Sequence, residues 1–222
     1  MKNKKNKKKK VFKLVIVLVL IVCLIAYLLN IKVKNIYVTG NKLLSDQEII
    51  ELSGLENYPR LFSKVSKVLE NKIKISPYIK SVNIKKNLVG KVKIEIEEYD
   101  LLLKDEKDNT VYLSNYKNIP LEDFVVGVPS LVNYVEKDIL KDFLEELNKI
   151  DKNILSKISE ITYSPNEYDK DLFLFYMNDG NYVYITTTRL LNINKYNQVL
   201  ENLDGKKGIL YLDSGNHFLV FE

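Results

Sequence analysis

The sequence predicts an α+β protein: a single N-terminal transmembrane helix, then a β-α-α-β-β domain, then a mixed, mostly antiparallel β domain with flanking helices. Three observations predict this class. An apolar run near the N-terminus is long enough to cross a bilayer. A strand, helix, helix, strand, strand pattern follows it directly. Beyond that pattern, further alternating strands are separated by turn residues and two amphipathic helices.

The apolar run extends from Leu14 to Leu29, and Tyr27 carries its only polar group. With its flanking residues it forms a helix of roughly 31 Å, which matches the hydrocarbon core of a bilayer. Eight lysines and no acid stand before it. Because short lysine-rich flanks stay inside the cell, we expect residues 1–13 to be a cytoplasmic basic tail and residues 14–30 a transmembrane helix. The bulk of the chain is then extracytoplasmic.

The rival interpretation is a cleaved signal peptide, which also has a basic start and an apolar middle. The run is longer than the roughly 7–15 residues usual for such a segment. Its exit, Ala26 to Lys32, lacks the small-x-small cleavage pattern. Both features favour an uncleaved anchor that contacts membrane lipid.

The basic charge belongs to the tail. The chain has a formal net charge of +5, and the first 13 residues contribute +8, which leaves −3 for the rest. A nucleic-acid-binding fold needs a basic patch, so we expect no nucleic-acid partner. The single cysteine, Cys23, lies in the span, so the outer part has no disulfide, zinc–cysteine cluster or thiol nucleophile.

Residues 31–99 show the order strand, helix, helix, strand, strand. The first helix starts at Ser45, which forms a capping-box pattern with Glu48, and ends at Gly54. The apolar residues of the other elements keep helical or alternating spacing: Ile36 and Val38, then Val65, Val68, Leu69 and Ile73, then Ile79, Val82, Ile84, Val92, Ile94 and Ile96.

This series resembles the POTRA (polypeptide-transport-associated) domain that opens the outer part of the FtsQ/DivIB cell-division proteins. The chain departs from that family at Lys86 and Tyr99, where the family has arginine, and near Leu88-Val89, where it has proline. The matching residues are Ile36-x-Val38-x-Gly40-Asn41, Leu55-x-Asn57 with Leu61-Phe62, Ser76 to Lys86, and Val92 to Tyr99.

Residues 100–222 are expected to form an FtsQ/DivIB-type β domain. Asp179-Gly180 is a strong hairpin signal, and Val128 to Leu131 is expected to be a connection. Strands are predicted at 101–103, 110–113, 158–163, 172–176, 182–185, 208–212 and 217–221, and helices at 139–147 and 190–203. The resemblance continues through Ile158 to Ile161, the Asp179-Gly180 hairpin, the helix around Tyr196 and the run Tyr211 to Gly215.

No catalytic constellation is found, so we expect no enzyme activity, cofactor, metal site or small-molecule substrate. His217 is the only histidine, so a metal site with several histidine ligands cannot form. We expect His217 to be a solvent-facing strand residue. Ser214, His217 and Asp213 crowd one turn without a nucleophile-elbow pattern. Adjacent acids such as Glu97 and Glu98 diverge and cannot flank one glycosidic bond. A cell-wall hydrolase is therefore excluded.

Binding is the remaining class of function. The last predicted strand, Phe218 to Phe221, has no proline or lysine to blunt an open edge, and open edges recruit strands from partners. From the residues alone, an ordinary strand covered by the preceding helix is an equal alternative. The resemblance favours the open edge, because this region of FtsQ/DivIB proteins binds FtsB/DivIC alongside FtsL. Carried over by position, it implies the partner-binding set Tyr211, Leu212, Ser214, Gly215, Phe218 and Val220.

The resemblance thus implies a non-catalytic divisome scaffold in the cell (inner or cytoplasmic) membrane at the division septum. Its partners would be FtsL-like and FtsB/DivIC-like single-pass proteins, and it would help control septal cell-wall synthesis. The alternative is a POTRA-containing, membrane-anchored accessory protein of secretion or outer-membrane transport. About 120 residues with two helices follow residue 99, which is not the pattern of a transporter barrel.

Overall fold

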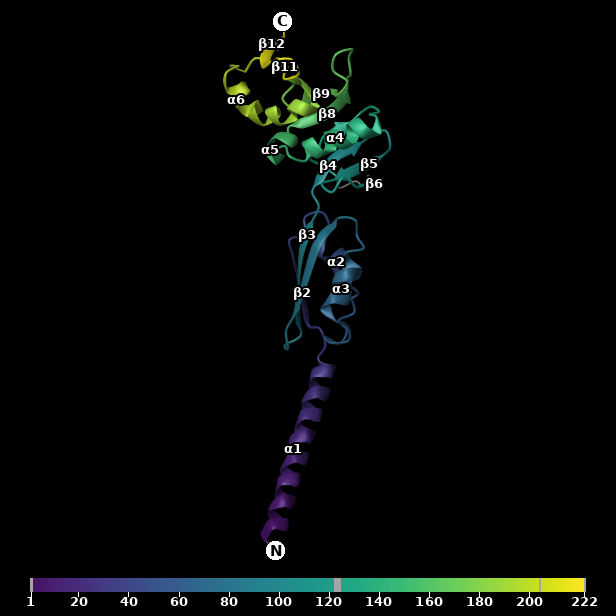
Figure 1. Ribbon diagram of the computed structural model, residues 1–222, viewed down its shortest axis with the longest axis vertical. Helices are drawn as coiled ribbons and strands as arrows, with labels where there is room; N and C mark the ends of the chain where they lie inside the picture. Colours follow the sequence, from purple (N-terminus) through teal and green to yellow (C-terminus); the bar gives the residue numbers. More distant parts are fainter. Residues whose placement is uncertain (1, 122–124, 204, 222) are drawn as a thin grey trace. The chain divides into compact units, whose positions relative to one another are not determined.

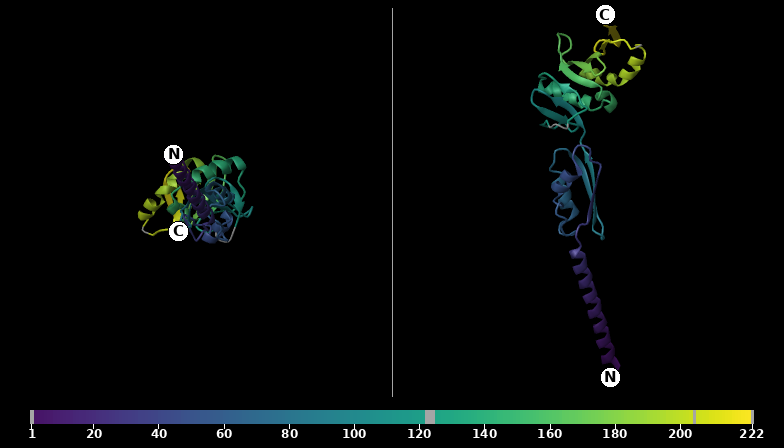
Figure 2. Two further views of the ribbon diagram at one scale, coloured as in Figure 1. Left: turned by 90° about the horizontal axis from the view of Figure 1, so that it is seen from below. Right: turned by 180° about the vertical axis from the view of Figure 1, so that it is seen from behind.

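The structure is a computed structural model that describes residues 2–121, 125–203 and 205–221, and the side chains from residue 10 onward within these ranges. Met1, the first residue of the predicted tail, lies outside them. The chain divides into two compact units, Met1–Glu98 and Tyr99–Glu222, whose elements are labelled in Figure 1 and seen from two further sides in Figure 2. The predicted α+β fold class is confirmed.

Helix α1 spans Lys2–Asn30 and is continuous. Its part from Lys10 to Asn30 is long and apolar enough to cross a membrane. The helix begins well before Leu14 because lysine is itself a good helix former. The predicted tail is therefore helical over its described residues.

The rest of the first unit is a three-stranded sheet with two helices on one face (Figure 1). The strand order is β1-β3-β2, with β1 parallel and β2 antiparallel to β3. Val92, Ile94 and Ile96 of β3 are buried, and the residues between them face outward. The elements are β1 (Asn35–Thr39), α2 (Asp46–Ser53), α3 (Ser66–Ile73), β2 (Ile79–Lys86) and β3 (Lys91–Glu98).

The predicted start and end of helix α2 are both confirmed. The Ser45 hydroxyl accepts from the Glu48 N–H at 3.2 Å, and the Glu48 carboxylate accepts from the Ser45 N–H at 2.7 Å. The Ser45 hydroxyl also donates to the Glu48 carboxylate at 2.7 Å, and this bond together with that from the Ser45 N–H lowers the pKa of Glu48. Gly54 ends the helix with a left-handed φ of +72°.

The second unit is built on a nine-stranded sheet in the order β12-β11-β10-β9-β8-β7-β4-β5-β6. Neighbours are antiparallel except β10–β11, β8–β7 and β7–β4, which are parallel. The strands are β4 (Leu101–Asp105), β5 (Thr110–Leu113), β6 (Asn118–Pro120), β7 (Ser130–Leu131), β8 (Ile158–Tyr163), β9 (Leu172–Met177), β10 (Tyr182–Thr186), β11 (Gly208–Tyr211) and β12 (His217–Val220). The helices are α4 (Lys137–Leu147), α5 (Lys152–Leu155), the 3₁₀ helix η1 (Thr187–Lys195) and α6 (Tyr196–Glu201).

Helix α4 forms the centre of this unit's core. The Phe143 ring stacks on Phe173 of β9 at 3.9 Å between centroids and meets Phe175 edge-on at 6.2 Å. All three side chains are fully buried. Helix α4 and η1 pack on this face of the sheet, so the opposite face of β9 to β12 is left for other contacts.

Two sequence-based predictions need correction. The predicted helix 190–203 is a 3₁₀ helix followed by a short α-helix. The reason is that buried residues recur at a spacing of three, which is the period of a 3₁₀ helix. They are Thr187, Leu190, Ile193 and Tyr196. The expected connection Val128 to Leu131 contains strand β7, whose two residues are too short to show an alternation.

Candidate partner-binding edge

Strand β12 is the terminal strand of the nine-stranded sheet. It pairs antiparallel with β11, with Val220 opposite Gly208 and His217 opposite Tyr211. Gly208 is required for this pairing, because a Cβ there would collide with the carbonyl of Leu219. The other edge of β12 has no neighbour among the strands that the structure describes.

Alternate residues of β12 turn their backbone groups toward that free edge. The Phe221 N–H donates to the Lys207 carbonyl at 2.9 Å, which sets the phase of the antiparallel ladder. Hydrogen-bonded and non-hydrogen-bonded pairs alternate, so Leu219 bonds to β11 while Phe218 and Val220 direct their N–H and C=O groups outward. We call these outward groups the open edge.

A small cavity lies beside the open edge, between β11, β12 and the η1–α6 segment. Its volume of about 150 Å³ is below the range of cofactor and drug sites and suits one or two side chains. It is lined by apolar Val199, Leu210, Leu212 and Phe218 and by polar Asn192, Lys195, Asn216 and His217.

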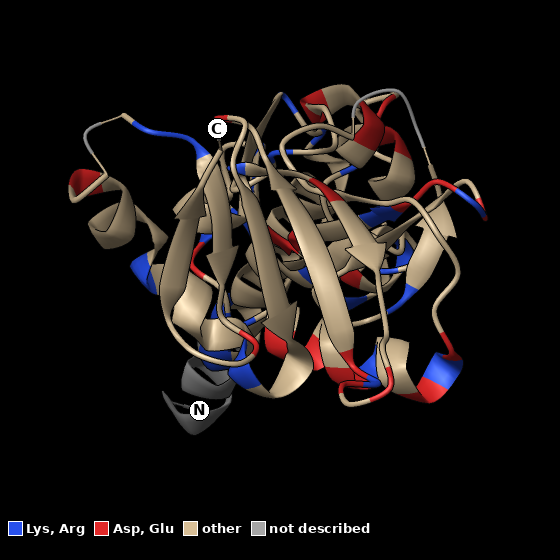
Figure 3. Cartoon of the chain, turned by 90° about the horizontal axis from the view of Figure 1, so that it is seen from above, with Lys and Arg blue, Asp and Glu red and all other residues tan. Residues whose placement is uncertain are grey.

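Aromatic rings cross the opposite face of these strands and end at His217, which also borders the cavity. Tyr211 stacks between Tyr184 of β10, at 5.4 Å, and His217 of β12, at 4.6 Å. We call Tyr184, Tyr211 and His217 the ring ladder. Burial raises the pKa of the Tyr184 hydroxyl. Strands β9 to β12 contain no charged residue, and strands appear mainly tan in Figure 3.

A buried polar network holds β11 in place. The Asn181 side chain accepts from the Gly208 N–H at 2.9 Å and donates to the Tyr196 hydroxyl at 2.9 Å. That hydroxyl donates to the Asp179 carboxylate at 3.0 Å. Burial raises the Tyr196 pKa. The network joins the β9–β10 turn, the start of α6 and the start of β11, and so positions the strand on which β12 rests.

The six residues of the predicted set all lie on the β11–β12 hairpin, but on different faces. Tyr211 belongs to the ring ladder, whereas Leu212 and Phe218 line the cavity. Val220 is 43% exposed. Ser214 and Gly215 lie in the turn between the strands.

Sequence reasoning missed the residues that reach the hairpin from other elements, namely Asn181, Asn192, Lys195 and Val199. Their only signal in the sequence is that Asn181 follows the predicted Asp179-Gly180 turn. His217 is exposed, as predicted. Among the described residues, no group of three His, Cys, Asp or Glu side chains could hold a metal ion.

An open sheet edge beside a small, partly apolar cavity is the arrangement to which extended segments of other proteins can be added. Residues 31–99 match the family model described as POTRA domain, FtsQ-type. The cell division protein DivIB of Bacillus subtilis (strain 168) is 32% identical over 199 residues, 86% of this chain and 74% of that protein. The cell division protein DivIB of Enterococcus faecalis (strain 62) is 32% identical over 83% of this chain, which spans about half (51%) of that relative.

Among solved structures, the major extracytoplasmic domain of the trans isomer of DivIB from Geobacillus stearothermophilus aligns over 49% of this chain and 96% of that one, with a TM-score of 0.40 and 23% identity. The sequence matches are sufficient: the chain belongs to the FtsQ/DivIB family of bacterial cell-division proteins. This is a family of non-enzymatic scaffolds, so membership of the family confirms the expectation that the chain has no enzyme activity. The chain's role lies in cell division through protein–protein interactions, which favours the division interpretation over the transport alternative.

Proposed function

We propose that the chain is a single-pass, N-in membrane protein of the division septum that binds FtsL-like and FtsB/DivIC-like partners outside the membrane. It would thereby help control septal cell-wall synthesis. In this proposal residues 1–13 are the cytoplasmic tail, residues 14–30 the span, residues 31–99 the POTRA domain and residues 100–222 the partner-binding β domain. The lysine-rich tail supports the N-in orientation.

The observation that carries the proposal is the open edge of β12. A partner segment added as a tenth strand would bond to the outward groups of Phe218 and Val220, the geometry of β-strand addition. Because strand side chains alternate between faces, every second partner residue would lie near the cavity lined by Leu212 and Phe218. The residues between them would extend the ring ladder at His217.

The six predicted residues have distinct roles in this proposal. Phe218 and Val220 supply backbone bonds, while Leu212 and Phe218 form the cavity wall. Tyr211 supports the ring of His217, and Ser214 and Gly215 form the turn that sets the β12 register. Tethering of both partners to one membrane raises their local concentration, so a modest interface suffices.

We predict that Val220→Pro weakens partner binding about fivefold, the equivalent of one lost hydrogen bond of roughly 1 kcal/mol. The removed N–H points away from β11, so the β11–β12 pairing is retained. The measurement is the affinity of the full-length chain, in nanodiscs, for a DivIC-type partner. Val220→Thr keeps the N–H and serves as the matched control.

Leu219→Pro provides the opposite case, because its N–H points toward β11 and its loss lowers stability. Circular dichroism of each variant reports whether the fold is intact. Unchanged affinity for Val220→Pro in a folded protein would refute the use of this edge.

A further inference from the structure

One end of the POTRA domain concentrates basic residues. The segments 31–35, 58–67 and 85–93 contain nine basic residues and no acid. We call these three segments the basic end. Glu70 and Glu95, from outside it, neutralise only part of this charge, through ion pairs with Lys67, Lys85 and Lys93. The basic residues are Lys32, Lys34, Arg60, Lys64, Lys67, Lys85, Lys86, Lys91 and Lys93.

Backbone hydrogen bonds join the three segments directly after the span. The Leu61 N–H donates to the Ile31 carbonyl at 2.7 Å, and the Lys34 N–H donates to the Gly90 carbonyl at 2.7 Å. Gly90 has a φ of +89°, and a Cβ there would come within 2.6 Å of the Lys32 carbonyl oxygen. Only glycine allows this close approach.

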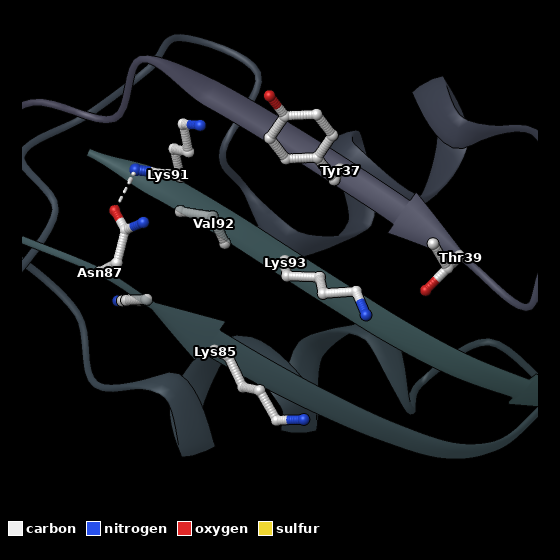
Figure 4. A pocket seen from close by; sticks show the side chains of 8 residues that line it. Tyr37, Thr39, Lys85, Asn87, Lys91, Val92 and Lys93 are labelled. Carbon is white, nitrogen blue, oxygen red and sulfur yellow. Dashed lines mark hydrogen bonds between the residues drawn. The ribbon is translucent and has the colours of Figure 1, made fainter. Parts of the chain in front are cut away.

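The half-buried Lys86 side chain links the turn between β2 and β3 to the loop before α3. The Lys86 ammonium donates to the carbonyls of Leu61, at 2.9 Å, and Lys64, at 2.5 Å. Burial lowers the Lys86 pKa. In Figure 4, Lys91 lies beside Asn87, whereas the side chains of Lys85 and Lys93 extend along the sheet away from Asn87.

Apolar side chains are exposed among these charges. Leu88 and Val89, at the tip of the β2–β3 turn, are 63% and 64% exposed, and Val65 is 71% exposed. Phe62 and Tyr58 are also exposed. The backbone of Tyr58 has a φ of +47°, a conformation that is unfavourable for a bulky residue. Tyrosine is also a residue type that is enriched at membrane–water interfaces.

Chain length places the basic end near the bilayer. The candidate span ends at Asn30, so Lys32 lies within about 7 Å of it. Arg60 pairs across from Lys32. Each headgroup layer is roughly 5–7 Å thick, so both residues reach the depth of lipid phosphates.

We propose that the basic end docks on the outer leaflet of the membrane, with Leu88 and Val89 among the headgroups and the basic side chains on anionic lipid phosphates. Charge complementarity and the short tether favour lipid over a protein partner. The inference requires α1 to be a span and is independent of partner binding at β12. Docking would fix the direction in which the POTRA domain leaves the membrane.

The first test places a fluorophore at Val89. The full chain carries Cys23→Ala and Val89→Cys, so that the fluorophore attaches at position 89 alone. The chain is placed in nanodiscs of phosphatidylcholine and phosphatidylglycerol in equal parts. Some lipid headgroups carry a spin label, which quenches a nearby fluorophore. The control is Ile75→Cys, since Ile75 is 79% exposed and lies at the other end of β2, about 25 Å away. We expect quenching at position 89 to exceed that at position 75 by at least about twofold, because only a label in the headgroup layer meets the quencher.

The second test reverses charge. Lys64→Glu/Lys91→Glu should reduce quenching at position 89 toward the level at position 75, and so should discs of phosphatidylcholine alone, because anionic lipid attracts surface lysines. Lys74→Glu/Lys141→Glu changes the net charge equally with exposed lysines outside the basic end. This control should leave the quenching unchanged.

Equal quenching at positions 75 and 89 would overturn the proposal, as would an equal effect of both charge reversals. A label at position 89 shielded from lipid-borne and aqueous quenchers alike would indicate a protein contact instead. Hydrogen exchange of the unmodified chain gives an independent reading. Amides of the turn 87–90 should exchange more slowly in anionic discs than in neutral ones, and equal rates would count against docking.

Discussion

Glu95 and Glu98 lie on opposite faces of β3, and their surroundings differ accordingly. Glu98 is buried, and its carboxylate accepts the backbone N–H groups of Lys42, Leu43 and Leu44 at 2.8–3.1 Å. It therefore fixes the loop that leads into α2. Glu95 faces outward and accepts from Lys93, Lys85 and Asn83, which lower its pKa to about 2.

The depressed pKa of Glu95 predicts a pH dependence of stability. A carboxyl with a lowered folded-state pKa stabilises the fold above its unfolded-state pKa, here 4.5, and this stabilisation is lost as the pH falls toward 2. Glu95→Gln should therefore be less stable than the parent near neutral pH, with a difference that shrinks below pH 4.5. Urea denaturation of the full chain in detergent over a pH series checks this. A difference independent of pH would contradict it.

At the scale of elements, local chemistry predicted some boundaries and tertiary packing decided others. The Ser45–Glu48 capping box and the Asp179-Gly180 hairpin depend on neighbouring residues only, so the sequence alone shows them. Strand β7 is defined by its parallel neighbours β4 and β8, which no local pattern reveals. The candidate site shows the same division: the β11–β12 hairpin is local, whereas Asn192 and Lys195 come from the distant η1.

The Asn181 network predicts a linked loss of stability and binding. Tyr196→Phe removes the hydroxyl that donates to Asp179 and accepts from Asn181, which leaves two polar groups without that partner. We expect a loss of about 1–3 kcal/mol in the free energy of unfolding and weaker binding of the DivIC-type partner, because β11 is held less firmly.

Tyr184→Phe is the matched control for this prediction. Its ring stacks on Tyr211, and removal of its half-exposed hydroxyl should change stability by less than about 0.5 kcal/mol. Equal effects of the two substitutions, measured by urea denaturation, would show that the network does not stabilise the hairpin.

At the scale of the whole molecule, charge is distributed by segment. The first 13 residues contribute +8 and the rest −3, so the positive charge is concentrated before the candidate span. The basic end of the POTRA domain is a second basic region, in which three of nine basic residues pair with Glu70 or Glu95. The proposed N-in orientation therefore requires the tail to outweigh that region.

Replacement of the seven lysines between Lys2 and Lys10 by glutamine should produce a mixture of orientations, because the inward bias is lost. A C-terminal alkaline phosphatase fusion, active only outside the cytoplasm, measures the outward fraction. The same seven lysines replaced by arginine keep the charge and should keep full activity. Undiminished activity of the glutamine variant would show that the tail does not set orientation.

The parallel pairing of β10 and β11 also sets an order of folding. Parallel neighbours need a crossover, which here comprises η1, α6 and the segment up to residue 207. Non-local pairing is slow compared with hairpin closure, so the β9–β10 hairpin forms before β11 and β12 can dock. A chain arrested before that step offers no site to a partner strand. Under the proposed strand addition at β12, late docking would restrict partner assembly to chains whose core is complete.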